Sequence, residues 1–156
     1  MKKLLSYAIV VLFAVSSWSC RKAEHGDSEV NGEEAVNYAA LTVGEWNFVD
    51  PGYGVSVYVS FDEEGTFDLY QKIGDGKYRH YSGTWSVDEN IISGLYSDGS
   101  EWGSSYSLEF VQADIMIMTA LNGSEDEMTY FKEAIPAEIK DNVIEVRSTD
   151  GYRPVL

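Results

Sequence analysis

The chain has 156 residues and a formal net charge of −15, which predicts one domain with a single hydrophobic core. This acidity argues against a nucleic acid or an anionic membrane surface as an electrostatic partner. One cysteine and two histidines cannot form an intramolecular disulfide or the usual zinc site, so we expect no metal and no other cofactor.

Residues 1–19 have the pattern of a secretory signal peptide. Two lysines precede the apolar run LLSYAIVVLFAV at residues 4–15, which is shorter than the ~20 apolar residues of a membrane-spanning helix. Cys20 follows this run after the four residues Ser-Ser-Trp-Ser and resembles the lipobox cysteine of bacterial lipoproteins, which implies diacylation at Cys20. Ser17 and Trp18 stand where a typical lipobox has an aliphatic and a small residue. Ordinary cleavage, leaving a secreted protein with a free thiol, is therefore the alternative.

Residues 20–41 are predicted to be a lipid-anchored acidic linker. The stretch RKAEHGDSEVNGEE has too little apolar surface to offset the entropy cost of ordering it. Near its end, Asn31 is in position to cap a short helix over GEEAVNYAAL, with Glu34 three residues later.

From Val43 onward the apolar pattern has a period of two, as in strands with one buried face. In GVSVYVSF, for example, Val55, Val57, Val59 and Phe61 share one side. The same reasoning predicts eight strands, at residues 43–49, 54–61, 66–73, 77–87, 91–96, 102–111, 115–121 and 128–132.

Short connections rich in Asp, Asn and Gly join these strands, so each is expected to pair antiparallel with the one before it. An up-and-down sheet of eight strands loses its exposed edges by closing on itself. We therefore predict an all-β fold, an eight-stranded antiparallel barrel over residues 42–133, with a short C-terminal helix.

Residues 134–156 are predicted to form that helix and a tail packed on the barrel. Pro136 stands where a helix would begin, and Ile135, Ile139, Val143 and Val146 recur at helical spacing. The alternative is a ninth strand over NVIEVRS, because three of its residues are β-branched.

Three short motifs resemble lipocalin-like domains of bacterial envelope lipoproteins. They are Gly44-x-Trp46 in the first strand, GTWSVD at residues 83–88 and TYFK at residues 129–132. In lipocalins the tryptophan of the first motif plugs one end of the barrel, which implies this role for Trp46. The arginine that stacks on this tryptophan has no clear match, and Lys132 is the nearest cation. The Thr-Asp-Tyr motif of mainstream lipocalins is missing before Ile115.

An eight-stranded barrel is either filled by side chains or holds one small ligand. If a cavity exists, Trp46, Tyr81, Trp85 and Tyr106 are expected to line it at the barrel ends. The residues expected to point inward are bulky, which favours filling; they are Val57, Phe61, Phe67, Leu69, Trp85, Leu108, Phe110, Ile115 and Ile117.

The stretch GLYSDGSEWGSSY at residues 94–106 combines Tyr96 and Trp102, expected to be exposed, with hydroxyl and carboxylate groups. Such a mixture can stack on a sugar and bind its hydroxyls. The alternative is an ordinary polar hairpin with interfacial aromatic residues, which has the same composition. Trp102 joins the candidate ligand residues on this basis. His80 lies beside Arg79, is expected at the surface and has no evident nucleophile partner.

We therefore predict a monomeric, noncatalytic lipoprotein of the bacterial cell envelope, anchored in a membrane, with the outer membrane expected. Its barrel binds a small apolar or saccharide ligand. The alternative is a filled barrel that docks an envelope protein through its outer face, as a structural or interaction module.

Overall fold

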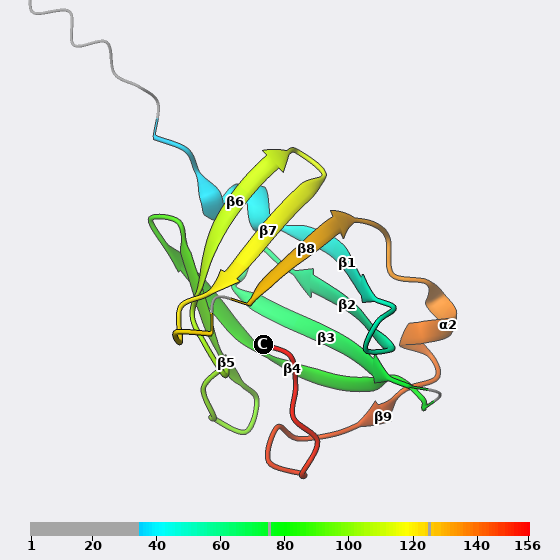
Figure 1. The fold of residues 1–156 in the computed structure, drawn as a ribbon. Helices are drawn as coiled ribbons and strands as arrows, with labels where there is room; N and C mark the ends of the chain where they lie inside the picture. Colours follow the sequence, from blue (N-terminus) through cyan, green and yellow to red (C-terminus); the bar gives the residue numbers. More distant parts are fainter. Residues whose placement is uncertain (1–34, 75, 125) are drawn as a thin grey trace, which may run out of the picture. The chain divides into compact units, whose positions relative to one another are not determined.

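The computed structural model describes residues 35–74, 76–124 and 126–156. The predicted signal peptide, Cys20 and residues 20–34 of the predicted linker lie outside the described residues. Figure 1 shows the elements; in chain order they are α1 (Tyr38–Thr42), β1 (Gly44–Asp50), β2 (Val55–Phe61), β3 (Thr66–Ile73), β4 (Arg79–Asp88), β5 (Ile91–Tyr96), β6 (Tyr106–Gln112), β7 (Ile115–Ala120), β8 (Glu127–Lys132), α2 (Ala137–Lys140) and β9 (Ile144–Glu145).

Strands β1 to β8 form the predicted closed, antiparallel, up-and-down barrel. Each strand pairs with the next, and β1 closes the ring against β8 through Trp46↔Lys132 and Asn47↔Phe131. The hairpins between β1 and β4 are paired along nearly their full length, whereas β5 and β6 share only two paired positions. We call this short stretch of pairing the β5–β6 seam.

The barrel interior is filled with large side chains, in keeping with the alternating strand pattern. Val57, Val59 and Phe61 of β2 are at most 2% exposed and point inward between partly exposed neighbours. Eighteen buried residues form one cluster; they are Trp46, Val57, Val59, Phe61, Phe67, Leu69, Tyr81, Trp85, Ile92, Tyr96, Trp102, Tyr106, Leu108, Met116, Met118, Ala120, Tyr130 and Leu156.

The predicted inward face of β7 is wrong by one residue. Met116 and Met118 are fully buried, while Ile115 and Ile117 are only partly buried on the outer face. Because the stretch Ile-Met-Ile-Met is apolar on both faces, its pattern contains no signal for register, and a one-residue shift exchanges the faces. A bulge in β6 between Phe110 and Gln112 makes this shift.

Strand β6 begins at Tyr106, four residues later than predicted. After the turn that follows β5, the chain returns along β5 for two residues only, with a bridge between Leu95 and Glu101 and a hydrogen bond from Trp102 N to Gly94 O (3.1 Å). Residues 103–105 then leave the ladder before β6 starts, which explains the short β5–β6 seam.

Both helices are shorter than predicted. Residues 35–37 are not helical, and α1 is capped by Asn37, whose side chain accepts from Ala40 N (3.1 Å), rather than by Asn31. Helix α2 spans only Ala137–Lys140, and neither helix is long or apolar enough to cross a membrane within the part of the chain described here.

The β-branched residues after α2 form β9, so the predicted alternative of a ninth strand is confirmed over Ile144–Glu145. Strand β9 pairs in parallel with Arg79 and His80 of β4. This edge of β4 is free because β5 pairs only with residues 83–88 of that strand. The predicted helical face of residues 135–146 is thus divided between α2 and β9.

Candidate functional site

The two ends of the barrel differ in what closes them. At one end, α1 packs on the barrel through Trp46, which is fully buried and donates from Nε1 to Thr42 O at 2.7 Å. Lys132 Nζ lies 5.1 Å from the centre of the Trp46 ring and donates to Val43 O. Trp46 therefore plugs the α1 end, with Lys132 as its cation. We call the opposite end the mouth.

The mouth is occupied by residues 152–156, which we call the tail. Tyr81, Tyr96 and Tyr106 donate from their hydroxyls to the carbonyls of Tyr152 (3.3 Å), Leu156 (2.6 Å) and Val155 (3.0 Å), in that order. Burial raises the pKa of all three tyrosines, that of Tyr106 to about 12, which keeps the hydroxyls protonated as donors.

Gln71 also holds the tail, through both polar atoms of its side-chain amide. Its Nε2 donates to Arg153 O at 3.1 Å, and its Oε1 accepts from Val155 N at 2.8 Å. Gln71 is only 2% exposed, so these bonds satisfy a polar group inside the barrel. Leu156, 1% exposed, completes the apolar cluster.

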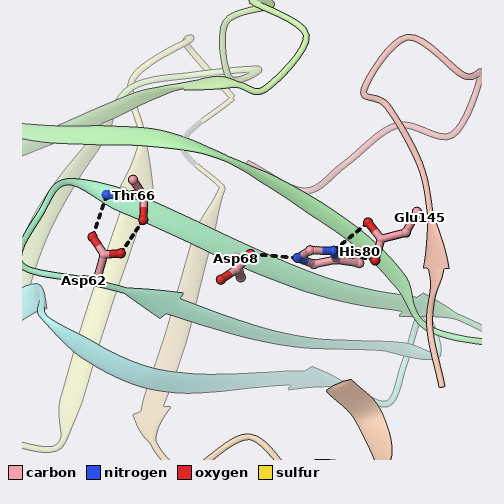
Figure 2. Close-up of polar contacts among 5 residues, drawn as sticks. All are labelled: Asp62, Thr66, Asp68, His80 and Glu145. Carbon is pink, nitrogen blue, oxygen red and sulfur yellow. Dashed lines mark hydrogen bonds and ion pairs between the residues drawn. The ribbon is translucent and has the colours of Figure 1, made fainter. Parts of the chain in front are cut away.

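The segment leading to the tail is fixed to the barrel by acidic groups. In Figure 2, His80 lies between Asp68 of β3 and Glu145 of β9: its Nε2 is 2.8 Å from Asp68 Oδ1, and its Nδ1 is 2.8 Å from Glu145 Oε2. The hydrogen bond to Asp68 raises the pKa of His80, and that to Glu145 adds to it. Further along, Ser148 Oγ donates to Asp98 Oδ2 at 2.8 Å.

Asp62 and Thr66, also drawn in Figure 2, have a local role. The Asp62 carboxylate accepts from the backbone N–H (2.7 Å) and the hydroxyl of Thr66, which closes the turn between β2 and β3. These hydrogen bonds lower the pKa of Asp62. The Asp62 carboxylate therefore stabilises the turn between β2 and β3.

A hollow of about 560 Å³ opens where the chain leaves the ladder between β5 and β6. We call it the outer hollow. Its volume falls within the range of small-molecule sites. It is lined by hydroxyl, carboxylate, aromatic and aliphatic groups from β4, β5 and the segment before β6, namely Thr84, Trp85, Ser86, Ser93, Gly94, Leu95, Glu101, Trp102, Gly103, Ser104 and Ser105.

Trp85 and Trp102 form the inner wall of the outer hollow and pack on Phe61 and Phe67. The ring centres of Phe67 and Trp102 are 5.2 Å apart, as are those of Phe61 and Trp85. Both tryptophans are more than nine-tenths buried, and the Nε1–H of each lacks a hydrogen-bond partner within the described part of the chain. Buried N–H donors are nearly always paired in proteins, so these two require an explanation.

A second hollow, of about 440 Å³, lies at the mouth beside the tail. We call it the mouth hollow. Phe48, Val55 and Met128 form part of its apolar wall, and Asp50, Asp126 and Glu127 bring carboxylates to it. Arg153, Pro154, Val155 and Leu156 of the tail line it as well.

The structure divides the five predicted ligand residues among three places. Trp46 belongs to the α1 end, Trp85 and Trp102 to the outer hollow, and Tyr81 to the tail contact; Tyr106 contacts the tail and lines the mouth hollow.

Tyr96 and Trp102, expected to be exposed, are 4% and 6% exposed. Tyr96 shares the inward face of β5 with Ile92, and the return of the chain after the turn brings the Trp102 ring over Gly94 into the buried cluster. Sequence reasoning also missed Gln71, Tyr96 and the tail itself as a connected group. The one available signal was a glutamine in the middle of an otherwise apolar inward face of β3.

The described residues contain no cluster of metal ligands, and His80, the one histidine among them, is not free to act as a base. Within residues 35–74, 76–124 and 126–156, no three His, Cys, Asp or Glu side chains gather as metal ligands would. Both ring nitrogens of His80 are engaged by carboxylates, which leaves neither directed at a substrate.

Comparisons with known proteins give structural neighbours but no family. No family model matches the chain, and no curated protein matches it. A solved structure titled "NMR structure of the protein from Bacteroides uniformis ATCC 8492" is similar, with 15% sequence identity and a TM-score of 0.49 over 62% of this chain and 93% of that one.

Proposed function

We propose that the chain is a noncatalytic, lipocalin-like lipoprotein of the bacterial envelope, tethered through Cys20, and that its outer hollow binds a small saccharide. The lipoprotein part rests on the sequence of residues 1–20. The lipocalin-like part rests on the three motifs and is supported by Trp46 at the α1 end beneath Lys132.

The saccharide part rests on the two unpartnered indole N–H groups at the wall of the outer hollow. A sugar hydroxyl or ring oxygen can accept from an indole N–H, and the surrounding serine hydroxyls and the Glu101 carboxylate can bind further hydroxyls. Both indole nitrogens are closed off from solvent, so binding requires residues 101–105 to move outward. These residues lie outside the named strands, so their movement would break the Leu95–Glu101 bridge and the hydrogen bond from Trp102 N to Gly94 O but leave the strand pairings of the barrel in place.

A titration of the full chain with a panel of soluble mono- and disaccharides, followed by NMR of the indole N–H signals, tests this function. We expect a saturable shift of the Trp85 and Trp102 signals, with the Trp46 signal as an internal reference. Ser93→Ala, inside the hollow, should weaken binding about fivefold, because a hydrogen bond to a polar ligand contributes ~1 kcal/mol. Ser97→Ala lies outside the hollow and is the matched control. If no saccharide shifts the two signals at millimolar concentration, the saccharide function is wrong.

The filled interior favours a second function, docking to another envelope protein through the outer face. Eighteen buried residues, including Leu156 of the tail, fill the barrel interior. A partner would therefore bind to the outer surface of the barrel. Exposed Val49 and Phe131 and partly buried Ile115 and Ile117 provide apolar area on strands β1, β7 and β8. Retention of a specific envelope protein on the full chain, in the absence of saccharide binding, would support this second function.

A further inference from the structure

The contacts of the tail have the chemistry of peptide recognition. Four side chains, Gln71, Tyr81, Tyr96 and Tyr106, bind five main-chain groups of residues 152–156. We propose that the mouth of the barrel is a binding site for an extended peptide, and that the tail occupies this site as a displaceable segment.

Most of this recognition is independent of the side chains of the bound segment. Gln71 offers one donor and one acceptor to Arg153 O and Val155 N, as a neighbouring strand would in a β-ladder. The residue between them, Pro154, has no N–H to be bound. The three tyrosine hydroxyls all donate to carbonyls, which every residue provides.

Selectivity comes from the ends of the segment and from charge. The Tyr152 ring lies 3.7 Å from the Arg79 guanidinium, and Leu156 is buried in the core. Arg153 lines the mouth hollow together with Asp50, Asp126 and Glu127. The expected partner is therefore an exposed protein segment of the pattern aromatic, basic, any residue, aliphatic, aliphatic.

The surroundings of the tail allow exchange. Open space of about 440 Å³ borders Arg153, Pro154, Val155 and Leu156, so a segment can leave sideways without separating barrel strands. Gly151, with φ of 83°, joins the tail to the segment held by Asp98 and Ser148. This glycine is a natural hinge, and the loop that precedes it stays attached when the tail leaves.

The test uses the full chain and the capped peptide acetyl-Tyr-Arg-Pro-Val-Leu-amide. In the variant Leu156→Asp a charge replaces the buried leucine, which weakens the tail in its own site and leaves the strands unchanged. We expect NMR titration to show saturable binding with shifts of the Gln71 side-chain amide. The wild-type chain should bind the peptide at least tenfold more weakly, because its attached tail competes at an effective concentration of about millimolar.

A peptide of identical composition, acetyl-Tyr-Arg-Val-Pro-Leu-amide, is the control. It places proline where Val155 donates to Gln71, so its affinity should be at least tenfold lower. If Leu156→Asp fails to fold, Val155→Pro weakens the tail without placing a charge in the core. Equal binding of the two peptides, or no binding to a folded variant, would overturn the proposal. Unfolding of both variants would also overturn it, because the tail would then be an inseparable part of the fold.

Discussion

At the scale of single residues, His80 is held in a geometry that only its charged form satisfies. Both ring nitrogens face carboxylates, and only a protonated imidazole can donate from both. The Tyr70 ring stacks on it at 4.8 Å and shields one face. Through Glu145, this contact fixes β9, from which the chain continues to the tail.

Because the folded-state pKa of His80 is raised, its stabilisation is complete below the unfolded pKa of about 6.5 and is lost as the pH rises through the folded value. We compare the free energy of unfolding of the wild type with that of His80→Gln. The advantage of the wild type is expected to be larger at about pH 6 than at about pH 9, by up to about 1 kcal/mol. This limit is small because the Asp68 and Glu145 side chains are 47% and 75% exposed. Denaturant unfolding at both pH values measures it, and a difference that grows toward high pH would contradict the assignment.

At the scale of elements, the close approach of β4 and β5 depends on Gly83. A Cβ atom at this position would lie 2.0 Å from Leu95 O and 2.8 Å from the Phe67 ring. Neither the paired backbone of β5 nor the buried ring can give way easily. This crowding explains why a glycine stands in the middle of a long strand, where it would otherwise be unfavourable.

Gly83→Ala is expected to reduce the free energy of unfolding by about 3 kcal/mol, as severe overpacking does. Gly76→Ala is the control, because its Cβ would meet no atom closer than 3.6 Å and should change stability by less than about 0.5 kcal/mol. Urea unfolding of both variants gives the comparison. A Gly83→Ala chain as stable as the Gly76→Ala chain would show that β4 and β5 are not packed as described.

The strands were the part of the fold best predicted from sequence. Alternation identified β3 and β5 with their bounds and placed all eight barrel strands in order. Alternation predicted the wrong inward face for β7, where both faces are apolar. It also predicted the wrong start for β6, where residues 103–105 leave the ladder before the strand begins. In these places the outcome depends on a bulge and on packing against distant strands, which no local pattern contains.

At the scale of the whole molecule, Cys20 is proposed to determine where the protein resides. Two acyl chains on this residue would hold the barrel at a membrane, since each buried CH₂ contributes ~0.8 kcal/mol. Cys20→Ser should therefore move the protein from the membrane to the soluble fraction of its host, with the barrel unchanged. Fractionation and intact-mass measurement of the acyl modification test this, and a Cys20→Ser protein that stays membrane-bound would contradict it.

The binding partners of the tail are the feature that the sequence could not predict. A tail packed on the barrel was expected, but Tyr-Arg-Pro-Val-Leu has no periodicity that identifies a binding partner. Its place depends on hydrogen bonds from Gln71 and three tyrosines. The two residues joined by each of these bonds are between 49 and 84 positions apart in the sequence. Two of those tyrosines, Tyr81 and Tyr106, were predicted to line a ligand cavity at the barrel ends, and in the structure their hydroxyls bind the chain itself.

The most direct test of this account is a search for NMR cross-relaxation between the Leu156 methyl groups and the aromatic rings of the buried cluster in the full chain. A barrel with an occupied mouth predicts strong cross-peaks, together with a Gln71 side-chain amide protected from hydrogen exchange. A Leu156 with the sharp, averaged signals of a freely moving residue and no contact with these rings would contradict it.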